Sequence, residues 1–363
     1  MFDVTIIGAG PAGSVAACML ARAGCDVTLV EQARFPRDKV CGESLSALGV
    51  AVLTRIGLAQ PVRAVGPAIL VRTALHSADG RSLTLRLPHP MWGVSRRAMD
   101  AVLLEAARQA GACVRQPARC EGLNGALLVR DLASNRVETF RPTWVIVADG
   151  KGALLPDRPP PTSDFGVKAH FADVVGPRDT VELFGVRGHY VGLAPIERGL
   201  SNVAFSVPAA RLEQSRGDLD ALWEQVCSEN PTLAARFAGA RRAGEWLASP
   251  LPRHGVARRW PRGVIPLGNS AAALEPIGGE GMGLAMRSAE LAAAALIETA
   301  RRGGCLPVRR LRAEFDRLWR MRRLGCRALA RLLSAPGMAG DAIDWGRVSE
   351  SLTRAVMRLL GKG

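Results

Sequence analysis

The stretch TIIGAGPAGSVAACMLARAGCDVTLVEQ, residues Thr5–Gln32, decides the fold of this chain. It opens with an apolar run typical of a buried strand and places Gly8, Gly10 and Gly13 at the start of an alanine-rich helical segment. A second apolar run follows and ends at Glu31. A strand, a helix and a second strand within about 30 residues predict the beginning of a doubly wound parallel sheet.

The three glycines predict that an anion lies against the start of this helix. Gly8 permits the tight turn out of the strand, Gly10 lets the backbone approach a pyrophosphate, and Gly13 allows close packing of helix on strand. Free amides and the positive end of the helix dipole both attract negative charge. Glu31 lies about 20 residues further on, where a carboxylate accepts both ribose hydroxyls and repels a ribose 2′-phosphate. The pattern predicts a dinucleotide site.

NAD and FAD share this adenosine-side fingerprint, so the later segments must separate them. The segment 34–46, RFPRDKVCGESLS, stands where an NAD dehydrogenase continues to its next strand and helix. VADG at 147–150 and PLGNSAAALEPIGGEGMGLA at 266–285 complete the pattern. Together these segments resemble the superfamily of flavin monooxygenases, geranylgeranyl reductases and flavin-dependent halogenases, over roughly residues 1–300. The resemblance implies a para-hydroxybenzoate hydroxylase-like fold with FAD as cofactor.

The fingerprint and the resemblance together predict the residues that bind the cofactor. Asn269 departs from the pattern, because the superfamily has an aspartate there; an amide still accepts a hydrogen bond but carries no charge. Glycines within 276–283 precede a long helix, so their amides are expected to stabilise negative charge on the flavin edge. The predicted FAD-binding residues are Gly8, Gly10, Pro11, Ala12, Gly13, Glu31, Gln32, Arg37, Cys41, Gly42, Glu43, Arg96, Asp149, Gly150, Gly268, Asn269, Pro276, Gly279, Gly281, Met282 and Gly283.

Three residues are candidates for catalysis. His189 and Tyr190 lie on a strand expected to cover the flavin ring, where either side chain can orient a substrate or carry a proton. The resemblance places Cys41 near the ring, as a redox partner or simply as a small packed residue. The spacing of cysteines and histidines matches no metal site.

The expected fold is α/β, with a Rossmann-type FAD-binding domain, an antiparallel substrate domain and C-terminal helices. A hairpin is predicted around Asp79 and Gly80, and several strands within 165–207. A proline-rich linker is predicted at 156–164. The predicted domains are 1–67, 88–155 and 262–304 for FAD, 68–87 and 164–261 for the substrate, and 305–363 for the C-terminal helices.

The tail from Pro307 to about Ser334 is predicted to be a basic amphipathic helix. Arginines occupy the face opposite an apolar stripe, so the helix fits an anionic membrane surface or an acidic carrier protein, or simply covers the domain. The predicted apolar stripe is Leu311, Phe315, Leu318, Met321, Leu324, Ala328 and Leu332.

The net charge of +15 is carried almost entirely by arginine, since Lys39, Lys151, Lys168 and Lys362 are the only lysines. The arginines are scattered and are not interleaved with stacking aromatic residues, so nucleic acid is not expected as a partner. Eight cysteines without a CxxC pair favour a reducing compartment. The expected location is the cytoplasm, either free or peripheral to a membrane.

Three flavin reactions are compatible with these motifs. The favoured reaction is hydroxylation or epoxidation of a small apolar or aromatic metabolite by a monooxygenase. The alternative is an ene-reductase that acts on isoprenoid double bonds. A halogenase is disfavoured, because the Trp-x-Trp-x-Ile-Pro motif is absent and residues 68–90 contain no lysine. Without a second dinucleotide fingerprint, NAD(P)H is expected to act as a transient electron donor. A non-catalytic flavin- or lipid-binding protein remains open because of Asn269.

Overall fold

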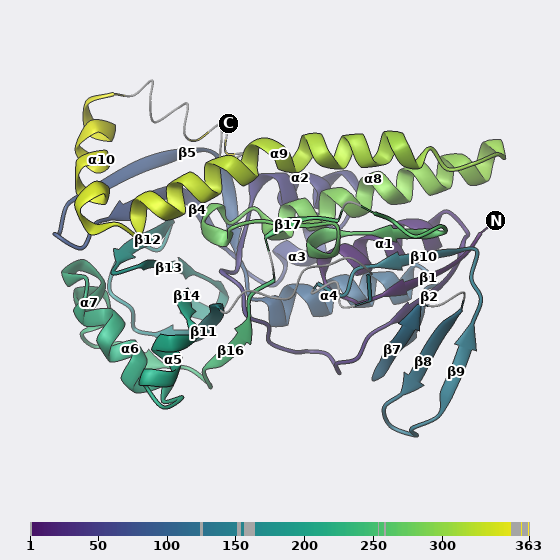
Figure 1. Ribbon diagram of the computed structural model, residues 1–363, viewed down its shortest axis with the longest axis horizontal. Coiled ribbons are helices and arrows are strands. Elements are labelled where there is room, and N and C mark those ends of the chain that lie inside the picture. The colour runs from purple at the N-terminus through teal and green to yellow at the C-terminus, as the bar shows by residue number, and fades with distance from the viewer. Residues whose placement is uncertain are drawn as a thin grey trace.

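The computed structural model describes residues 2–123, 126–150, 154–155, 164–252, 254–257, 259–349, 357 and 362. Two sheets lie side by side, and the long helix α9 runs along their upper edge (Figure 1). The predicted linker at 156–164 falls outside the described residues except for Asp164, which begins a strand. The chain has the predicted α/β fold.

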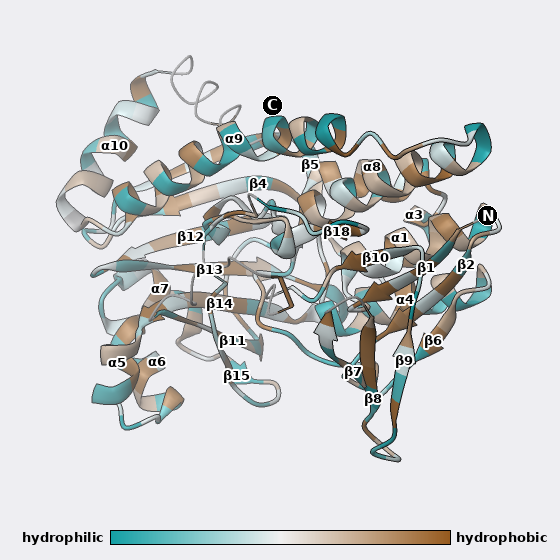
Figure 2. Cartoon of the chain, turned by 45° about the vertical axis from the view of Figure 1, so that its right-hand side comes forward, coloured by the Kyte–Doolittle hydropathy of each residue, from teal (hydrophilic) through white to brown (hydrophobic). Residues whose placement is uncertain are grey.

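The first sheet is parallel and carries the glycine fingerprint. Its strands are short and mostly apolar, and all but the edge strand Cys113–Arg115 are largely buried, as in other parallel sheets (hydropathy in Figure 2). In spatial order the strands are β18 (Val264–Pro266), β10 (Trp144–Val147), β1 (Asp3–Ile7), β2 (Asp26–Val30) and β6 (Cys113–Arg115).

Helices cover one face of this sheet and a small second sheet covers the other. Ile6 of β1 packs with the helices, whereas its neighbour Ile7 packs with the small sheet, as the two-residue period of a strand dictates. No strand was predicted for residues 118–140, which form the small sheet. The helices are α1 (Pro11–Arg22), α2 (Ala47–Arg55), α3 (Ala59–Arg63), α4 (Arg96–Gln109) and α8 (Gly281–Arg302), and the small sheet contains β7 (Ala118–Leu123), β8 (Leu127–Asp131) and β9 (Val137–Phe140).

The second large sheet is mainly antiparallel, as predicted. The predicted hairpin is confirmed, although its second strand continues to Gly93, and it joins the sheet through a parallel pairing of β4 with β12. The strands are β15 (Arg241–Arg242), β11 (Asp164–Ala172), β14 (Ser201–Pro208), β13 (His189–Pro195), β12 (Thr180–Val186), β4 (Ala68–His76), β5 (Ser82–Gly93) and β3 (Ser44–Leu45), with β16 (Leu247–Pro250) paired to β11 and a separate pair β17 (Gly255–Val256) and β19 (Ala272–Ala273).

Three short helices close one face of the second sheet over an aromatic core. Phe171 and Phe205 of the sheet pack on Trp223, with ring centroids 5.7 and 5.8 Å away. The opposite face of the sheet meets α9. The helices are α5 (Ala209–Gln214), α6 (Leu219–Ser228) and α7 (Pro231–Phe237).

The predicted tail helix is present as α9 (Val308–Leu333), followed by α10 (Pro336–Val348). Its predicted apolar stripe is wrong at Met321, Leu324 and Ala328, which are exposed, Met321 to 51% and Leu324 to 58%. Beyond Phe315, steps of three and four residues lead equally well through Leu318 or through Trp319. The structure follows the second path: Trp319 packs on Phe315, with ring centroids 5.5 Å apart, and Cys326 packs in one cluster with Leu183 of β12 and Tyr190 of β13. No helix in the described part of the chain is long and apolar enough to cross a membrane.

Gly13 tests how closely α1 approaches β1. A Cβ at this position would lie 1.8 Å from the backbone oxygen of Gly8. We expect Gly13→Ala to lower the free energy of unfolding by at least about 2 kcal/mol, because a side chain forces helix and strand apart. Urea denaturation measures the loss. Gly337→Ala is the matched control, since Gly337 also lies in the first turn of a helix and no atom lies within 4 Å of its added Cβ; an equal loss in both variants would contradict the explanation.

Candidate functional site

A cavity of about 310 Å³ lies where the motifs of the sequence analysis meet. It begins at the N-terminus of α1, passes the loop 39–44, and continues along the segment 267–282 at the start of α8. Segments separated by more than 200 residues therefore form one wall. The predicted convergence of two helix N-termini is present in the structure.

The glycines of the fingerprint have different roles: Gly10 lines the cavity, and Gly8 makes the turn that precedes it. Gly10, Pro11 and Ala12 line the cavity, and a Cβ on Gly10 would lie 3.6 Å from the Arg96 guanidinium. Gly8 does not line it. With φ of +98°, Gly8 makes the turn against the backbone of Ala148, where a Cβ would lie 2.5 Å from the carbonyl oxygen. Gly8 therefore shapes the loop that the ligand would contact.

Glu31 holds the same loop in place. Its two carboxylate oxygens accept hydrogen bonds from the amides of Ala9 and Ala33, each at 2.8 Å. Each oxygen keeps a second acceptor site, so the contact with ribose stays a prediction. Gln32 is exposed and is not among the residues that line the cavity; the structure gives this predicted contact no support.

Lys39 is the cavity residue that the sequence analysis missed. Burial, together with the neighbouring Arg96 and Arg37 guanidinium groups, lowers the pKa of Lys39 to about 8. Among the described residues no carboxylate forms an ion pair with Lys39. A poorly solvated cation that faces a cavity beside a helix N-terminus fits a pyrophosphate, so the pocket fits a dinucleotide. The only sequence signal was that lysine is rare in this chain.

Two arginines predicted to contact FAD are held by one buried carboxylate. Arg96 donates from Nε and Nη2 to Asp100 at 2.8 and 2.6 Å, and Arg37 reaches the same side chain at 3.0 Å. Arg96 still lines the cavity. Arg37 does not, because it turns toward Asp100 and stacks over Phe35 at 4.4 Å. The prediction of a direct FAD contact is supported by position for Arg96 and not for Arg37.

The departure at Asn269 lies in a short 3-10 turn, Gly268–Ser270. Gly268, Asn269 and Gly150 line the cavity. Asp149 does not line it; its carboxylate accepts a hydrogen bond from Ser270 Oγ at 2.5 Å. Asp149 therefore supports the turn that carries Asn269.

The start of α8 presents free amides to the cavity. Gly279 has φ of +62° and Glu280, the N-cap residue, makes no side-chain cap, so the first amides of α8 lack a side-chain partner there. Pro276, Gly279, Gly281 and Met282 line the cavity, whereas Gly283 packs on α2, where a Cβ would lie 2.2 Å from Ser46 Oγ.

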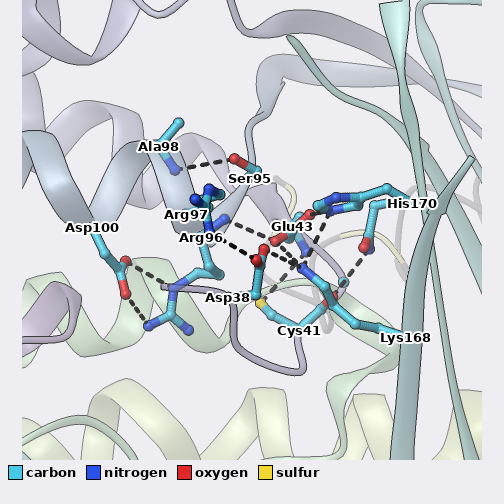
Figure 3. Close-up of polar contacts among 12 residues, drawn as sticks. Asp38, Cys41, Glu43, Ser95, Arg96, Arg97, Ala98, Asp100, Lys168 and His170 are labelled. Atoms are coloured by element: carbon cyan, nitrogen blue, oxygen red, sulfur yellow. Dashed lines mark hydrogen bonds and ion pairs between the residues drawn. The ribbon is translucent and has the colours of Figure 1, made fainter. Parts of the chain in front are cut away.

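Glu43 lies at the centre of a buried polar cluster between the two large sheets (Figure 3). Its oxygens meet Lys168 Nζ at 2.5 Å and His170 Nε2 at 2.6 Å, and the Arg96 amide donates to Oε1 at 2.8 Å. Burial alone would raise the pKa of this carboxyl, but the hydrogen bond from His170 and the Lys168 charge hold the pKa below its usual value. The cluster fixes Cys41 and Gly42, which line the cavity.

The candidates His189 and Tyr190 are neighbours on β13, and their side chains point to opposite faces of the sheet. Tyr190 lines the cavity and donates from its hydroxyl to Glu275 Oε1 at 2.9 Å. His189 points to the other face, where it lies beside Phe205 and bonds to the Arg187 carbonyl at 3.0 Å. Burial and then Arg211 lower the pKa of His189 to about 4. His189 is not among the residues that line the cavity, so the structure gives the prediction of a catalytic His189 no support.

Beyond Tyr190 the cavity continues as an apolar chamber. Its polar rim is the Tyr190–Glu275 pair together with His254, whose Nδ1 lies 3.5 Å from Glu275 Oε2. The side chains of the chamber come from β4, β5, β12, the 3-10 helix Pro276–Gly278 that precedes α8, α9 and the C-terminal segment. They are Leu75, Leu85, Leu87, Met91, Val181, Leu183, Ile277, Leu329 and Met357.

Glu43→Gln tests the buried cluster. The change removes the close, buried carboxylate of Lys168 and leaves the partly exposed Asp38 carboxylate 3.8 Å away, so we expect a loss of about 3–5 kcal/mol in the free energy of unfolding, measured in urea. Asp173→Asn is the control, because it removes a carboxylate from an exposed ion pair with Arg241 and should cost less than about 1 kcal/mol. Adding Lys168→Met to Glu43→Gln should recover part of the loss. Equal losses at Glu43 and Asp173 would contradict the role of the cluster.

Lys39 predicts a pH dependence of FAD binding. The group is charged below its pKa of about 8 and neutral above it, so binding a pyrophosphate above pH 8 requires uptake of a proton. The dissociation constant for FAD, measured by fluorescence quenching, should rise roughly tenfold between pH 7 and pH 9. Lys39→Arg should bind FAD with little change over this range. The same slope in both proteins would exclude Lys39 as its source.

Comparison with known proteins agrees with the site. The chain is 58% identical to menaquinone reductase of Mycolicibacterium smegmatis over 57 residues, 16% of this chain and 14% of that protein. It is 28% identical to digeranylgeranylglycerophospholipid reductase 1 of Methanopyrus kandleri over 82% of this chain and 80% of that protein. The fold matches that of the flavin-dependent brominase Bmp2 with a TM-score of 0.81 and 20% identity, over 99% of this chain and 93% of the brominase.

The family model described as an FAD binding domain matches residues 1–305. The match includes both helix N-termini, the loop that carries Lys39 and Glu43, and the turn at Asn269. The chain therefore belongs to the FAD-binding-domain family of FAD-dependent oxidoreductases.

Proposed function

We propose that this protein is a reductase that saturates carbon–carbon double bonds in a long apolar substrate of the polyprenyl class. The apolar chamber carries the proposal, because it joins the FAD pocket directly and its walls are leucine, methionine, valine and isoleucine side chains. The similarity to a digeranylgeranylglycerophospholipid reductase over most of both chains supports the same choice. The monooxygenase favoured by the motifs becomes the second candidate.

The chain's own residues supply the cofactor grip. Lys39, Arg96 and the start of α1 would hold the pyrophosphate, and the start of α8 would face the flavin. FAD, when bound and reduced, supplies a hydride to one carbon of a double bond. The other carbon then requires a proton from the protein.

Tyr190 is placed to deliver that proton. Burial, followed by the nearby Glu275 carboxylate, raises the pKa of Tyr190 well above 10, so its hydroxyl keeps its proton at neutral pH. The hydroxyl hydrogen-bonds to Glu275, whose other oxygen faces His254. Tyr190 thus carries a proton at the cavity wall, and Glu275 and His254 would form the path that replaces a proton given to substrate carbon.

The chamber selects the substrate by desolvation. A prenyl chain loses no hydrogen bonds when it leaves water and buries apolar surface at roughly 25 cal/mol per Å². A charged or strongly polar substrate would lose its hydration along the apolar walls. Polar side chains that line the cavity near these walls include Thr73 of β4 and Lys362, which is paired with Glu280 at 2.9 Å.

Oxygen transfer is the second candidate, favoured by one observation. The relay from Tyr190 to His254 would equally serve to move a proton on a phenolic substrate. Halogenation has less support. Lys168 is held by Glu43, and Lys39 lies beside Arg96 at the pyrophosphate end of the cavity. Lys362, which lines the cavity beside Met91, forms an ion pair with Glu280 at 2.9 Å.

An anaerobic single turnover separates the two candidates. FAD-loaded protein, reduced with dithionite, is mixed with geranylgeranylglycerophospholipid in detergent under argon. We expect the flavin to reoxidise and the lipid to gain two hydrogens per turnover, as measured by absorbance and mass spectrometry. Flavin that reoxidises only after oxygen is added, with an oxygen atom in the product, would overturn the reductase in favour of the monooxygenase.

Tyr190→Phe tests the proton donor. We expect the rate of lipid reduction to fall by about a hundredfold or more, while FAD binding is unchanged, because the phenyl ring keeps the packing and lacks the proton. Thr73→Val is the control, since it removes a chamber hydroxyl that is not in the relay, and it should lower the rate less than tenfold by the same measure. A Tyr190→Phe enzyme as fast as this control would assign the proton to another group.

A further inference from the structure

The outer face of α9 carries positive charge that the protein does not neutralise. This face, the basic outer face, consists of the exposed residues of α9. Among its charged residues Asp316 is the lone acid, and of the arginines only Arg310 forms an ion pair with a described carboxylate, to Glu314 at 3.4 Å. The residues of the face are Arg309, Arg310, Ala313, Asp316, Arg317, Arg320, Met321, Leu324, Arg327, Ala328 and Arg331.

Two large apolar side chains lie within this face. Met321 and Leu324 are 51% and 58% exposed and follow Arg317 and Arg320 at helical spacing. Single exposed apolar residues are ordinary. Two large apolar side chains between arginines along a 26-residue helix are typical of a helix that lies in the membrane interface.

The next helix also exposes large apolar side chains. α10 exposes Met338, Trp345 and Val348, which are 60%, 68% and 83% exposed. Tryptophan is enriched at membrane interfaces, because its ring is apolar and its indole N–H stays near the polar headgroups. The C-terminal helices thus combine unneutralised arginines with exposed apolar side chains.

The basic outer face and the apolar chamber lie on opposite sides of α9. Leu329, on the inner face of α9, lines the chamber, while Arg327 and Ala328 beside it belong to the outer face. α9 lies along the outer edge of the molecule, with its opposite side against the rest of the fold (Figure 1; hydropathy in Figure 2). A surface in contact with α9 would therefore lie next to the chamber.

We propose that α9 docks along the surface of a bilayer that contains anionic phospholipids. The arginines meet the headgroup phosphates, and Met321 and Leu324 enter the boundary between headgroups and acyl chains. An acidic protein would satisfy the arginines but would need a dry pocket for each apolar side chain, whereas a bilayer accepts both. The proposal stands on the surface of α9 and does not depend on the reaction that the protein catalyses.

Vesicle flotation at low salt tests the docking, with FAD-loaded protein and vesicles of phosphatidylcholine alone or mixed with phosphatidylglycerol. We expect binding to the mixed vesicles and little to phosphatidylcholine, with release as salt is raised. Arg317→Glu combined with Arg320→Glu should weaken binding by at least about tenfold. Arg136→Glu combined with Arg141→Glu makes the same charge change at exposed positions outside α9 and should leave binding unchanged.

A second pair of substitutions separates the membrane from an acidic protein. Met321→Ser combined with Leu324→Ser keeps every charge, and we expect it to weaken vesicle binding several-fold, with unchanged circular dichroism and FAD absorbance. Failure of the unaltered protein to float with anionic vesicles overturns the proposal. Equal loss in the two arginine pairs also overturns it, because net charge alone would then explain binding. Full vesicle binding by the serine variant overturns the insertion of Met321 and Leu324 into the bilayer, because charge alone would then explain the binding.

Discussion

The Glu43 carboxylate joins the two halves of this protein. It accepts the amide of Arg96 from the helix that packs on the parallel sheet, and it pairs with Lys168 and His170 of the antiparallel sheet. The group has no exposed surface, so its charge is satisfied only while both sheets keep their distance. Through this contact the loop that carries Cys41 and Glu43, which line the cavity, is tied to both sheets.

The cavity changes character along its length, and that change organises the function. At one end Lys39, Arg96 and a helix N-terminus concentrate positive charge where a pyrophosphate would lie. At the other end leucine, valine and methionine side chains form an apolar chamber, with Tyr190 and Glu275 at the junction. A charged, bound cofactor and an apolar substrate would therefore meet at the hydrogen-bonded pair of Tyr190 and Glu275.

The C-terminal helices extend this separation to the surface. The inner face of α9 completes the chamber, and its outer face carries arginines with Met321 and Leu324 among them. One stripe of α9 thus faces the chamber, and the other faces the surface of the protein. Because each stripe satisfies a three-to-four-residue repeat, the sequence pattern shows that the helix is amphipathic without showing which stripe is buried.

The sequence by itself determined several features that depend on neighbours within about 30 residues: the glycine turn, the helix at Pro11, the hairpin around Gly80 and the tail helix. The small sheet of β7, β8 and β9 is equally local and was not predicted. Tertiary structure alone decided how distant groups pair. Lys39 facing the cavity, Arg37 turning to Asp100 and Glu43 meeting Lys168 all depend on folded distances that no local pattern encodes. His189 shows the difference, because its residue type suggests catalysis and the register of its strand places it on the other face of the sheet.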